Sequence, residues 1–288
     1  MMNLFRVTLL ILVANLVGGC RTTQPLAQNQ HLHLSWTNNL LTVTGPDIPG
    51  GKLSIWYLEA FCGPHAHDQS WSKTTIPHKT RLVRASEQGN LLEFETTVSG
   101  GVAMSHRVQV VADGLAFDYT LINKSDAHSD IQWFQPACIR VAEFTGSDQT
   151  NFIKRSFIFT KRGLTLLADT GRTEDALYKG GQVYIPAVIT AKEANPRPLA
   201  AAQPVNGLIG CFSADNTQLL ATASDQTHEL FEGVYVCLHS DPHVGGLKPG
   251  ETRKFHARLY LVPNNIPALL KSYHADFPPT KSSARVSF

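Results

Sequence analysis

The stretch that decides the fold is residues 229–262, ELFEGVYVCLHSDPHVGGLKPGETRKFHARLYLV. An apolar run at 234–238 is followed by a polar break at 239–243, and an alternating apolar pattern resumes at 255–261. Glycine- and proline-containing turns separate the two runs, as is typical of paired β-strands. The stretch therefore predicts two strands, with imidazoles and a carboxylate placed where the first strand ends.

Short alternating runs separated by turn residues fill most of the chain. They occupy residues 31–36, 40–44, 52–62, 80–85, 91–98, 103–111, 115–123, 131–141, 152–159, 164–167, 208–212 and 218–223. The connections between residues 80 and 123 are short, which requires neighbouring strands to be antiparallel. The pattern predicts an all-β protein in which residues 31–278 form one large antiparallel sandwich.

Two segments depart from this pattern. Residues 264–278 predict the one convincing helix, because Asn264 or Asn265 can cap an apolar stripe that contains Leu269 and Tyr273. Residues 168–206 are rich in Gly and Pro and too long for a simple turn, so we expect a functional excursion there. Residues 279–288 are expected to form a loose tail.

Charge and composition argue against one class of partner, nucleic acids. The 288 residues are 43% hydrophobic and carry a formal net charge of +2, with no stripe of Lys and Arg. Binding to nucleic acid has no electrostatic support in such a chain.

The first twenty residues predict export. Arg6 precedes an apolar run at 7–17, and small residues lead to Cys20. This order is typical of a signal peptide, and LVGGC resembles a bacterial lipobox, whose cysteine carries the lipid. We expect a signal at 1–20, a polar tether at 21–30 and a protein held by lipid at the membrane of the bacterial cell envelope. Ordinary secretion with cleavage near Gly19 is the alternative.

The cysteine count agrees with a lipid on Cys20. Four cysteines remain once it is set aside: Cys62, Cys138, Cys211 and Cys237. An even set permits disulfides, but four cysteines allow three pairings and the sequence does not choose among them. Free buried thiols are the alternative, since a chain of this size does not need covalent links to be stable.

Two segments resemble the galactose mutarotase-like superfamily of β-supersandwich proteins, within a group of exported bacterial lipoproteins. One is ADGLAFDYTLINKSD at 112–126 with WFQP at 133–136, and the other is GVYVCLHSDP at 233–242 with LKPGE at 247–251. The resemblance implies a site for carbohydrate in the concave groove of a large sheet. Members include aldose epimerases and domains of polysaccharide lyases and hydrolases.

The chain departs from the epimerase pattern at both catalytic positions. Residues 134–138, FQPAC, stand where epimerases carry the general-acid histidine, and His239 stands where they carry the basic glutamate. Epimerisation needs one group to take the anomeric hydroxyl proton and another to protonate the ring oxygen. Simple mutarotation therefore requires that the acid–base pair has moved elsewhere in this chain.

Histidines and a carboxylate recur at spacings that suit a site. His239, Asp241 and His243 follow each other at every second position, which places them on one side of an extended backbone. Imidazoles there can act in acid–base chemistry or bind a metal; the alternative is a solvated polar turn.

A second histidine cluster lies in the N-terminal half. His65 and His67 are also two residues apart, and His78 follows before a predicted strand. Together with His243 they offer ligands for a divalent metal, whereas the alternative is that each bonds a backbone carbonyl.

Other residues suit the recognition of a sugar. Arg140 and Arg197 can hold an acidic group, and Trp71 can stack on a sugar ring. Glu59 lies within an alternating run and is either solvated or directed into a pocket, where its pKa would be raised. Gln135 lies in the WFQP segment.

These observations predict an exported carbohydrate-active protein that acts on a saccharide through His78, His239, Asp241 and Gln135, as a lyase, glycosidase or epimerase-like enzyme. Arg140, Arg197, Trp71 and Glu59 would contact the saccharide. The alternative is a carbohydrate-binding envelope lipoprotein that uses the same groove without catalysis.

Overall fold

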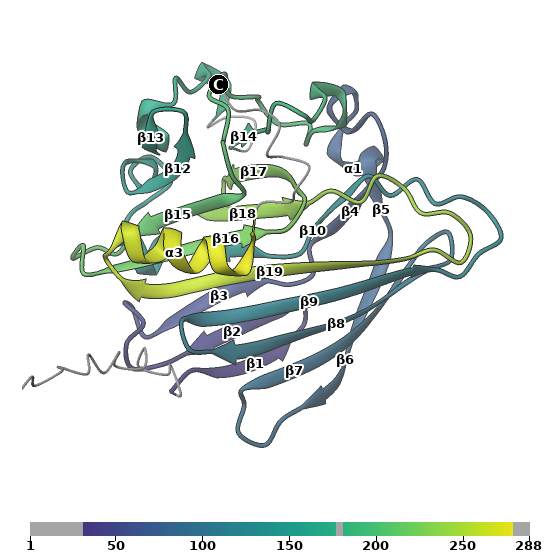
Figure 1. The fold of residues 1–288 in the computed structure, drawn as a ribbon, viewed down its shortest axis with the longest axis horizontal. Helices are drawn as coiled ribbons and strands as arrows, with labels where there is room; N and C mark the ends of the chain where they lie inside the picture. Colours follow the sequence, from purple (N-terminus) through teal and green to yellow (C-terminus); the bar gives the residue numbers. More distant parts are fainter. Residues whose placement is uncertain (1–30, 177–180, 279–288) are drawn as a thin grey trace, which may run out of the picture.

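The computed structural model describes residues 31–176 and 181–278, which form three antiparallel sheets (Figure 1). The two large sheets contribute buried side chains to one shared apolar core. The expected all-β architecture is therefore confirmed. The predicted leader at 1–20, which includes Cys20, the predicted tether at 21–30 and the predicted tail at 279–288 lie outside the described residues. Within the described part, no helix is long and apolar enough to cross a membrane.

The larger sheet has nine strands and contains the predicted meander. In spatial order it consists of β13 (Gly163–Leu166), β12 (Ser156–Thr160), β15 (Leu208–Phe212), β16 (Gln218–Ser224), β19 (Thr252–Pro263), β9 (Gly114–Asn123), β8 (Val102–Val111), β7 (Leu91–Val98) and β6 (His78–Ala85). Strands β6 to β9 pair in sequence order, as their short connections require.

The second sheet has seven strands and carries the candidate site. In spatial order it consists of β1 (His33–Thr37), β2 (Leu40–Thr44), β3 (Lys52–Trp56), β11 (Cys138–Arg140), β18 (Cys237–Pro242), β17 (Thr227–Gly233) and β14 (Gln182–Tyr184). A small third sheet consists of β10 (Trp133–Gln135), β4 (Ala60–Cys62) and β5 (Thr75–Ile76). Strand β10 contacts β18, so the small sheet lies against the second sheet.

Alternation decides which side chains enter the core. In β8, Met104, His106 and Val108 are buried, whereas the residues between them are exposed. The backbone also packs closely where β9 begins: at Gly114, which has a positive φ, a Cβ atom would lie 2.0 Å from the carbonyl oxygen of Leu259. Only glycine fits this approach.

The predicted helix is present as α3 (Ile266–Asp276), which lies along β19 and β16 (Figure 1). The Asn265 side chain caps it by accepting a hydrogen bond from the Ala268 amide at 3.1 Å. Leu269 and Tyr273 pack on an apolar cluster around Tyr260, and burial of the Leu269 side chain contributes roughly 1.5–3 kcal/mol. The other helical segments are single turns: α1 (Trp71–Thr74), α2 (Ala142–Thr145), η1 (Ala66–Asp68), η2 (Phe152–Lys154), η3 (Leu167–Asp169), η4 (Glu174–Ala176) and η5 (Ala191–Glu193).

The prediction of one strand at 52–62 was wrong. The chain leaves the seven-stranded sheet after β3 and joins the small sheet at β4, with residues 57–59 as the connection. Tyr57 is still fully buried, but Glu59 lies in the connection and is partly exposed. Because Glu59 lies outside both strands, the alternation of a strand does not decide which way its side chain points.

Two other predicted strands are interrupted. The run at 131–141 forms β10 and β11, in different sheets, because Pro136 lacks the amide that a continuous ladder needs. The run at 152–159 begins as the helical turn η2 before it becomes β12.

The prediction that a strand at 234–238 ends at His239 was also wrong. Residues 234–236 form the turn between β17 and β18, and His239 to Pro242 belong to the buried strand β18. The backbone places His239 and Asp241 on one face of a central strand rather than in a solvated turn. Their polar side chains are therefore desolvated.

His106 is a buried polar residue in the core between the large sheets. Its Nδ1 lies 2.6 Å from the Tyr57 hydroxyl, and its Nε2 lies 2.9 Å from the Thr96 hydroxyl. Burial lowers the pKa of His106 to about 3. The folded state therefore holds a neutral imidazole, whereas the unfolded chain takes up a proton near its ordinary pKa of 6.5.

We expect this difference to weaken the fold in mild acid. Because the folded pKa is lowered, the stability that His106 contributes is complete above pH 6.5 and is lost as the pH falls toward 3. Between pH 8 and pH 5 the loss is about 2 kcal/mol. His106→Gln can bond both hydroxyls but does not titrate. Between pH 8 and pH 5 its free energy of unfolding should therefore fall by about 2 kcal/mol less than that of the wild type, as measured by urea unfolding at both pH values. Equal losses in the two proteins would contradict this account.

Candidate functional site

The candidate site is a pocket of about 250 Å³ on the seven-stranded sheet. Its walls come from β17, β18 and β11 on one side and from loops of distant parts of the chain on the other. The lining residues are Glu59, Trp71, Gln135, Cys138, Asn195, Arg197, Phe231, Gly233, Val234, Tyr235, Cys237 and His239. Five residues predicted from the sequence thus meet there: Glu59, Trp71, Gln135, Arg197 and His239.

The floor of the pocket is a row of alternating side chains. In the antiparallel pair β17–β18, Phe231 lies opposite His239 and Glu229 lies opposite Asp241. Residues opposite each other in a ladder project from the same face of the sheet. His239 and Asp241 are therefore neighbours on one face, and both side chains are almost completely buried.

The small third sheet supplies the second wall. Gln135, the last residue of β10, donates from Nε2 to Asp241 Oδ2 at 3.1 Å. The Glu59 amide donates to the Gln135 carbonyl at 3.0 Å, which fixes the segment before β4. The Glu59 carboxylate then lies beside His239, with 3.6 Å between Oε2 and Nδ1.

The excursion at 168–206 supplies the third wall. The backbone amide of Asn195 donates to Glu229 Oε2 at 2.9 Å, and the backbone carbonyl of Asn195 lies 2.9 Å from His67 Nδ1. Arg197, two residues on, places its guanidinium 5.8 Å from the centre of the Trp71 ring. An indole and a guanidinium therefore stand together at the pocket.

Burial raises the pKa values of the two acidic groups beneath the pocket, Asp241 and Glu229. Desolvation raises the pKa of Asp241 to about 7, although His239 and the hydrogen bond from Gln135 act against it. Desolvation raises the pKa of Glu229 as well, and the charge of Asp241 raises it further. Two carboxyl groups this close do not both ionise readily, so at neutral pH the pair holds a proton.

His239 is held in its charged form by its neighbours. Burial by itself lowers the pKa of the imidazole, but interactions with Cys138, Glu59 and Asp241 outweigh it and raise the pKa above the ordinary value. An imidazolium beside the Glu59 carboxylate is an acid and a base in contact.

Three polar atoms at this point have no hydrogen-bond partner among the described residues. They are Glu59 Oε2, His239 Nδ1 and Asp241 Oδ1. Buried polar atoms without partners are costly, and they are common where a ligand or water completes the bonding. Their convergence at one pocket is the reason we treat it as the candidate site.

His78 and Arg140 lie outside the lining of the pocket. His78 Nε2 is 3.4 Å from the Leu58 carbonyl, and its ring packs edge-on against Phe61, so it supports the segment that carries Glu59. The Arg140 guanidinium lies 5.6 Å from the centre of the Tyr235 ring at the surface.

The three histidines predicted as metal ligands bond elsewhere and do not form one group in the described part of the chain. His65 and His67 hold the segment at Glu193 and Asn195, through the His65 amide and the His67 ring. The His243 ring stacks on His228, with ring centres 5.3 Å apart, and His228 stacks on Trp133. Of the three rings, the His67 ring bonds a backbone carbonyl, as the alternative describes.

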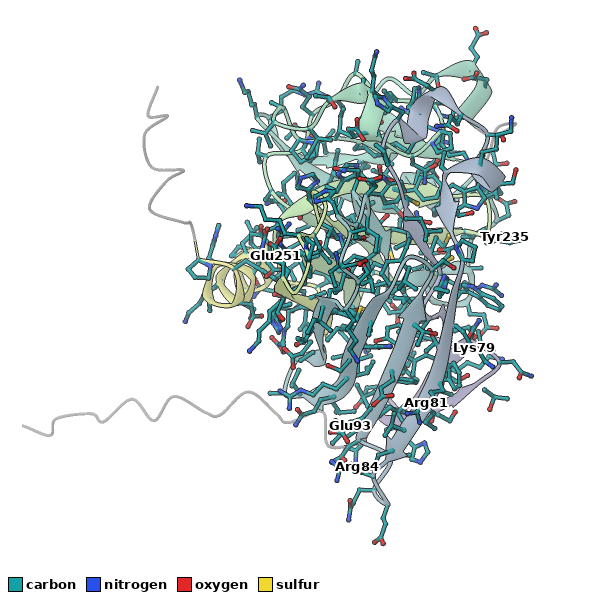
Figure 2. The ribbon with its side chains drawn as sticks, turned by 90° about the vertical axis from the view of Figure 1, so that its right-hand side faces the viewer. Lys79, Arg81, Arg84, Glu93, Tyr235 and Glu251 are labelled. Atoms are coloured by element: carbon teal, nitrogen blue, oxygen red, sulfur yellow. The ribbon has the colours of Figure 1, made fainter. Side chains whose placement is uncertain are left out.

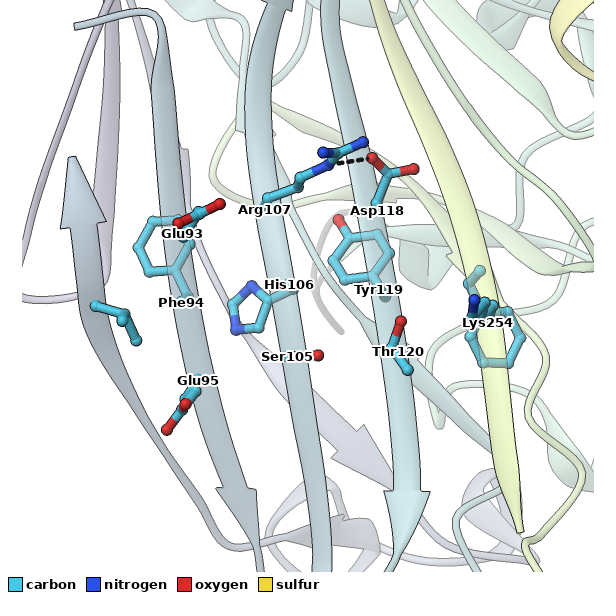
Figure 3. Close-up of a pocket in the computed structure, with 12 residues that line it drawn as sticks. Glu93, Phe94, Glu95, Ser105, His106, Arg107, Asp118, Tyr119, Thr120 and Lys254 are labelled. Atoms are coloured by element: carbon cyan, nitrogen blue, oxygen red, sulfur yellow. Dashed lines mark hydrogen bonds and ion pairs between the residues drawn. The ribbon is translucent and has the colours of Figure 1, made fainter. Parts of the chain in front are cut away.

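A larger pocket, of about 510 Å³, lies on the outward face of the nine-stranded sheet (Figure 3). Its charged groups form exposed cross-strand pairs, such as Arg107 with Asp118 at 2.7 Å and Glu93 with Arg84 at 2.7 Å. Exposed pairs of this kind are already solvated and contribute little. The smaller pocket contains the buried, unpartnered groups, so we assign the site there.

Sequence reasoning missed several residues of the pocket. Tyr235 is 68% exposed beside the pocket, and Figure 2 shows it at the rim of the molecule, on the side where Lys79 and Arg81 also lie. The residues 234–236 looked like part of a buried strand, which concealed the turn. Cys138 and Cys237 were considered as disulfide partners or as free buried thiols, but not as residues of a site; both are free, as are Cys62 and Cys211.

The architecture defines a class: a large antiparallel β-sandwich with a pocket over one central strand. No family model and no curated protein matches the sequence. Among solved structures, the chain is similar to galactose mutarotase-like proteins from Clostridium acetobutylicum (11% identity, TM-score 0.43, 80% of this chain and 94% of that chain) and Lactobacillus casei (9%, 0.41, 80% and 99%). It is also similar to an alpha-mannosidase from Enterococcus faecalis (10%, 0.46), over 88% of this chain and 32% of that chain. Galactose mutarotase-like proteins, which the sequence was expected to resemble, are thus among the solved structures to which the chain is similar.

Replacing Asp241 should reveal the cost of its burial. The folded pKa of about 7 lies above the ordinary value of 3.8, so the ionised group destabilises the fold above pH 7, and the wild type gains stability as the pH falls from 7 toward 4. Asp241→Asn keeps an acceptor for Gln135 and should raise the free energy of unfolding by about 1–3 kcal/mol at pH 8. Chemical denaturation at pH 8 and pH 5 measures the effect.

The exposed Asp126→Asn serves as the matched control and should show no such change. A difference between Asp241→Asn and the wild type that is the same at both pH values would contradict the assignment of the raised pKa.

Proposed function

We propose that this protein binds a saccharide in the pocket of Glu59, Trp71, Arg197 and His239, and that Glu59 and His239 exchange protons with it. The observation that carries the proposal is the contact of the Glu59 carboxylate with the buried His239 imidazole, 3.6 Å apart on the wall of the pocket. This pair supplies an acid and a base where the sequence lacks both residues of the epimerase pattern.

The lining of the pocket suits a sugar. The Trp71 indole offers an apolar face for a ring, and the Arg197 guanidinium offers paired donors for a carboxylate or hydroxyls. A volume of about 250 Å³ lies just below the ~300–1,000 Å³ usual for small-molecule sites, so the pocket suits a single sugar unit. Arg197 favours a uronate or another acidic sugar.

The spacing of the pair favours one kind of reaction. Glycoside hydrolysis uses two carboxyl groups about 5–9.5 Å apart, with the bond to be broken between them. Glu59 and His239 are closer and of opposite charge. They suit two oxygens bound to one carbon, as in a cyclic hemiacetal, where Glu59 takes the hydroxyl proton and His239 protonates the ring oxygen.

The place of action is also a proposal. The leader pattern that ends at Cys20 supports export and attachment through a lipid to the bacterial cell envelope, where saccharides are abundant. The described domain would then face the envelope space.

Glu59→Gln tests the chemistry without removing volume. We expect the full-length protein to accelerate the exchange between anomers of at least one aldose or hexuronate, measured by NMR exchange spectroscopy on a panel of sugars. Glu59→Gln should lower that acceleration by about 10²–10⁴-fold and change the dissociation constant only a few-fold. Trp71→Ala should instead weaken binding, roughly tenfold, because it removes the stacking surface.

Glu143→Gln, an exposed glutamate that pairs with Lys52, is the matched control and should leave both quantities unchanged. Saccharide binding without any acceleration would remove the catalytic role and leave the binding protein that the sequence allows. If no sugar on the panel binds, the proposal fails altogether.

A further inference from the structure

We propose that Cys138, Cys237 and His239 form a metal site that takes zinc, with its open position directed into the pocket. One ligand atom from each residue lies within 4.8 Å of the others, and all three side chains are buried. The proposal goes beyond saccharide binding, because the metal would be held whether or not a sugar occupies the pocket.

The distances suit tetrahedral coordination. Zinc binds thiolate sulfur at ~2.3 Å and imidazole nitrogen at ~2.0–2.1 Å, so neighbouring ligand atoms in a tetrahedron are about 3.5–3.8 Å apart. Cys237 Sγ already lies 3.4 Å from His239 Nε2. The limit of 4.8 Å for the whole set means that the third ligand moves by no more than about 1 Å, within the reach of a side-chain adjustment.

The backbone holds the ligands firmly. Cys237 and His239 alternate along β18, and Cys138 is on the adjacent strand β11, whose register pairs Arg140 with Cys237 and Ile139 with Leu238. Continuing that register places Cys138 opposite His239. Ligands on central strands of a sheet are positioned more exactly than ligands on loops.

The surroundings of His239 resemble those of a metal-bound histidine. Metal-binding histidines commonly donate their second ring nitrogen to a carboxylate, which orients the ring. Here Nε2 faces Cys237, and Nδ1 faces Glu59 Oε2 at 3.6 Å and Asp241 Oδ1 at 3.9 Å. Gln135 in turn fixes Asp241. The unpartnered carboxylate oxygens of Glu59 and Asp241 are therefore placed to orient the His239 ring rather than to bind the metal.

The pocket leaves the fourth position accessible. All three ligand residues line it, so water or a hydroxyl of a bound molecule can reach the ion. Gly233 keeps this space open: a Cβ atom at residue 233 would lie 2.7 Å from Cys237 Sγ. Three protein ligands with one open position are typical of catalytic rather than structural zinc sites.

Binding also keeps the proton that faces Glu59. Two thiols and the imidazolium each release one proton, from the two sulfurs and from Nε2, as the cation binds. The Nδ1 proton stays in place, facing Glu59. The proposed acid–base contact and the metal site therefore use opposite sides of one imidazole.

Metal uptake by the full-length protein tests the inference without a sugar. The protein is reduced, freed of metal and titrated with zinc, and bound zinc is measured after gel filtration. Cobalt serves as a probe, because thiolate-to-cobalt absorption reports sulfur ligands directly. We expect one equivalent of zinc, sulfur-to-cobalt absorption, and weakening by at least about 100-fold in Cys138→Ser and in Cys237→Ser.

Cys211→Ser is the matched control, since Cys211 is a free thiol buried in the apolar core, and it should bind zinc like the wild type. Gly233→Ala should weaken uptake without removing a ligand. Thermal unfolding of each variant identifies any that fail to fold. The proposal would be overturned by no uptake in the reduced wild type, by cysteine variants that both bind zinc as tightly as the wild type, or by a Cys138–Cys237 disulfide that excludes zinc. None of these outcomes bears on saccharide binding.

Discussion

The desolvation of ionisable side chains on one face of β17 and β18 is the constraint on which the rest of the site depends. Asp241, Glu229 and His239 are buried in the middle of a sheet, where a charge without partners is strongly unfavourable. The structure meets the cost by sharing a proton between carboxyl groups and by placing an imidazolium between carboxylates. Apolar residues at these positions would make the fold more stable but would leave the pocket without groups that can exchange protons.

Two segments distant in sequence supply hydrogen-bond partners to this polar row. Gln135 reaches Asp241 from the small sheet, and Asn195 reaches Glu229 from the long excursion. Each brings a further group with it: the Gln135 carbonyl holds the amide of Glu59, and Arg197 follows Asn195. The segments that form the walls of the pocket are thus held in place by hydrogen bonds to the buried carboxyl groups beneath it.

His239 joins two kinds of chemistry in one ring. Its Nδ1 belongs to the carboxylate side of the pocket and its Nε2 belongs to the sulfur side. A change on either side alters the proton balance of the other, because both nitrogens share one aromatic system. The proposed sugar chemistry and the proposed metal site are for that reason physically linked, although each can be measured alone.

The sequence by itself determined the antiparallel meander from β6 to β9 and the capped helix α3, because alternation, short turns and an N-cap are local signals. It also indicated Glu59, Trp71, Gln135, Arg197 and His239 as candidates by residue type. Only the tertiary structure decided that these five meet, that His78 and Arg140 lie outside, and that Cys138 and Cys237 flank His239. Strand pairing between residues about 100 positions apart decides such neighbours, and no local pattern encodes it.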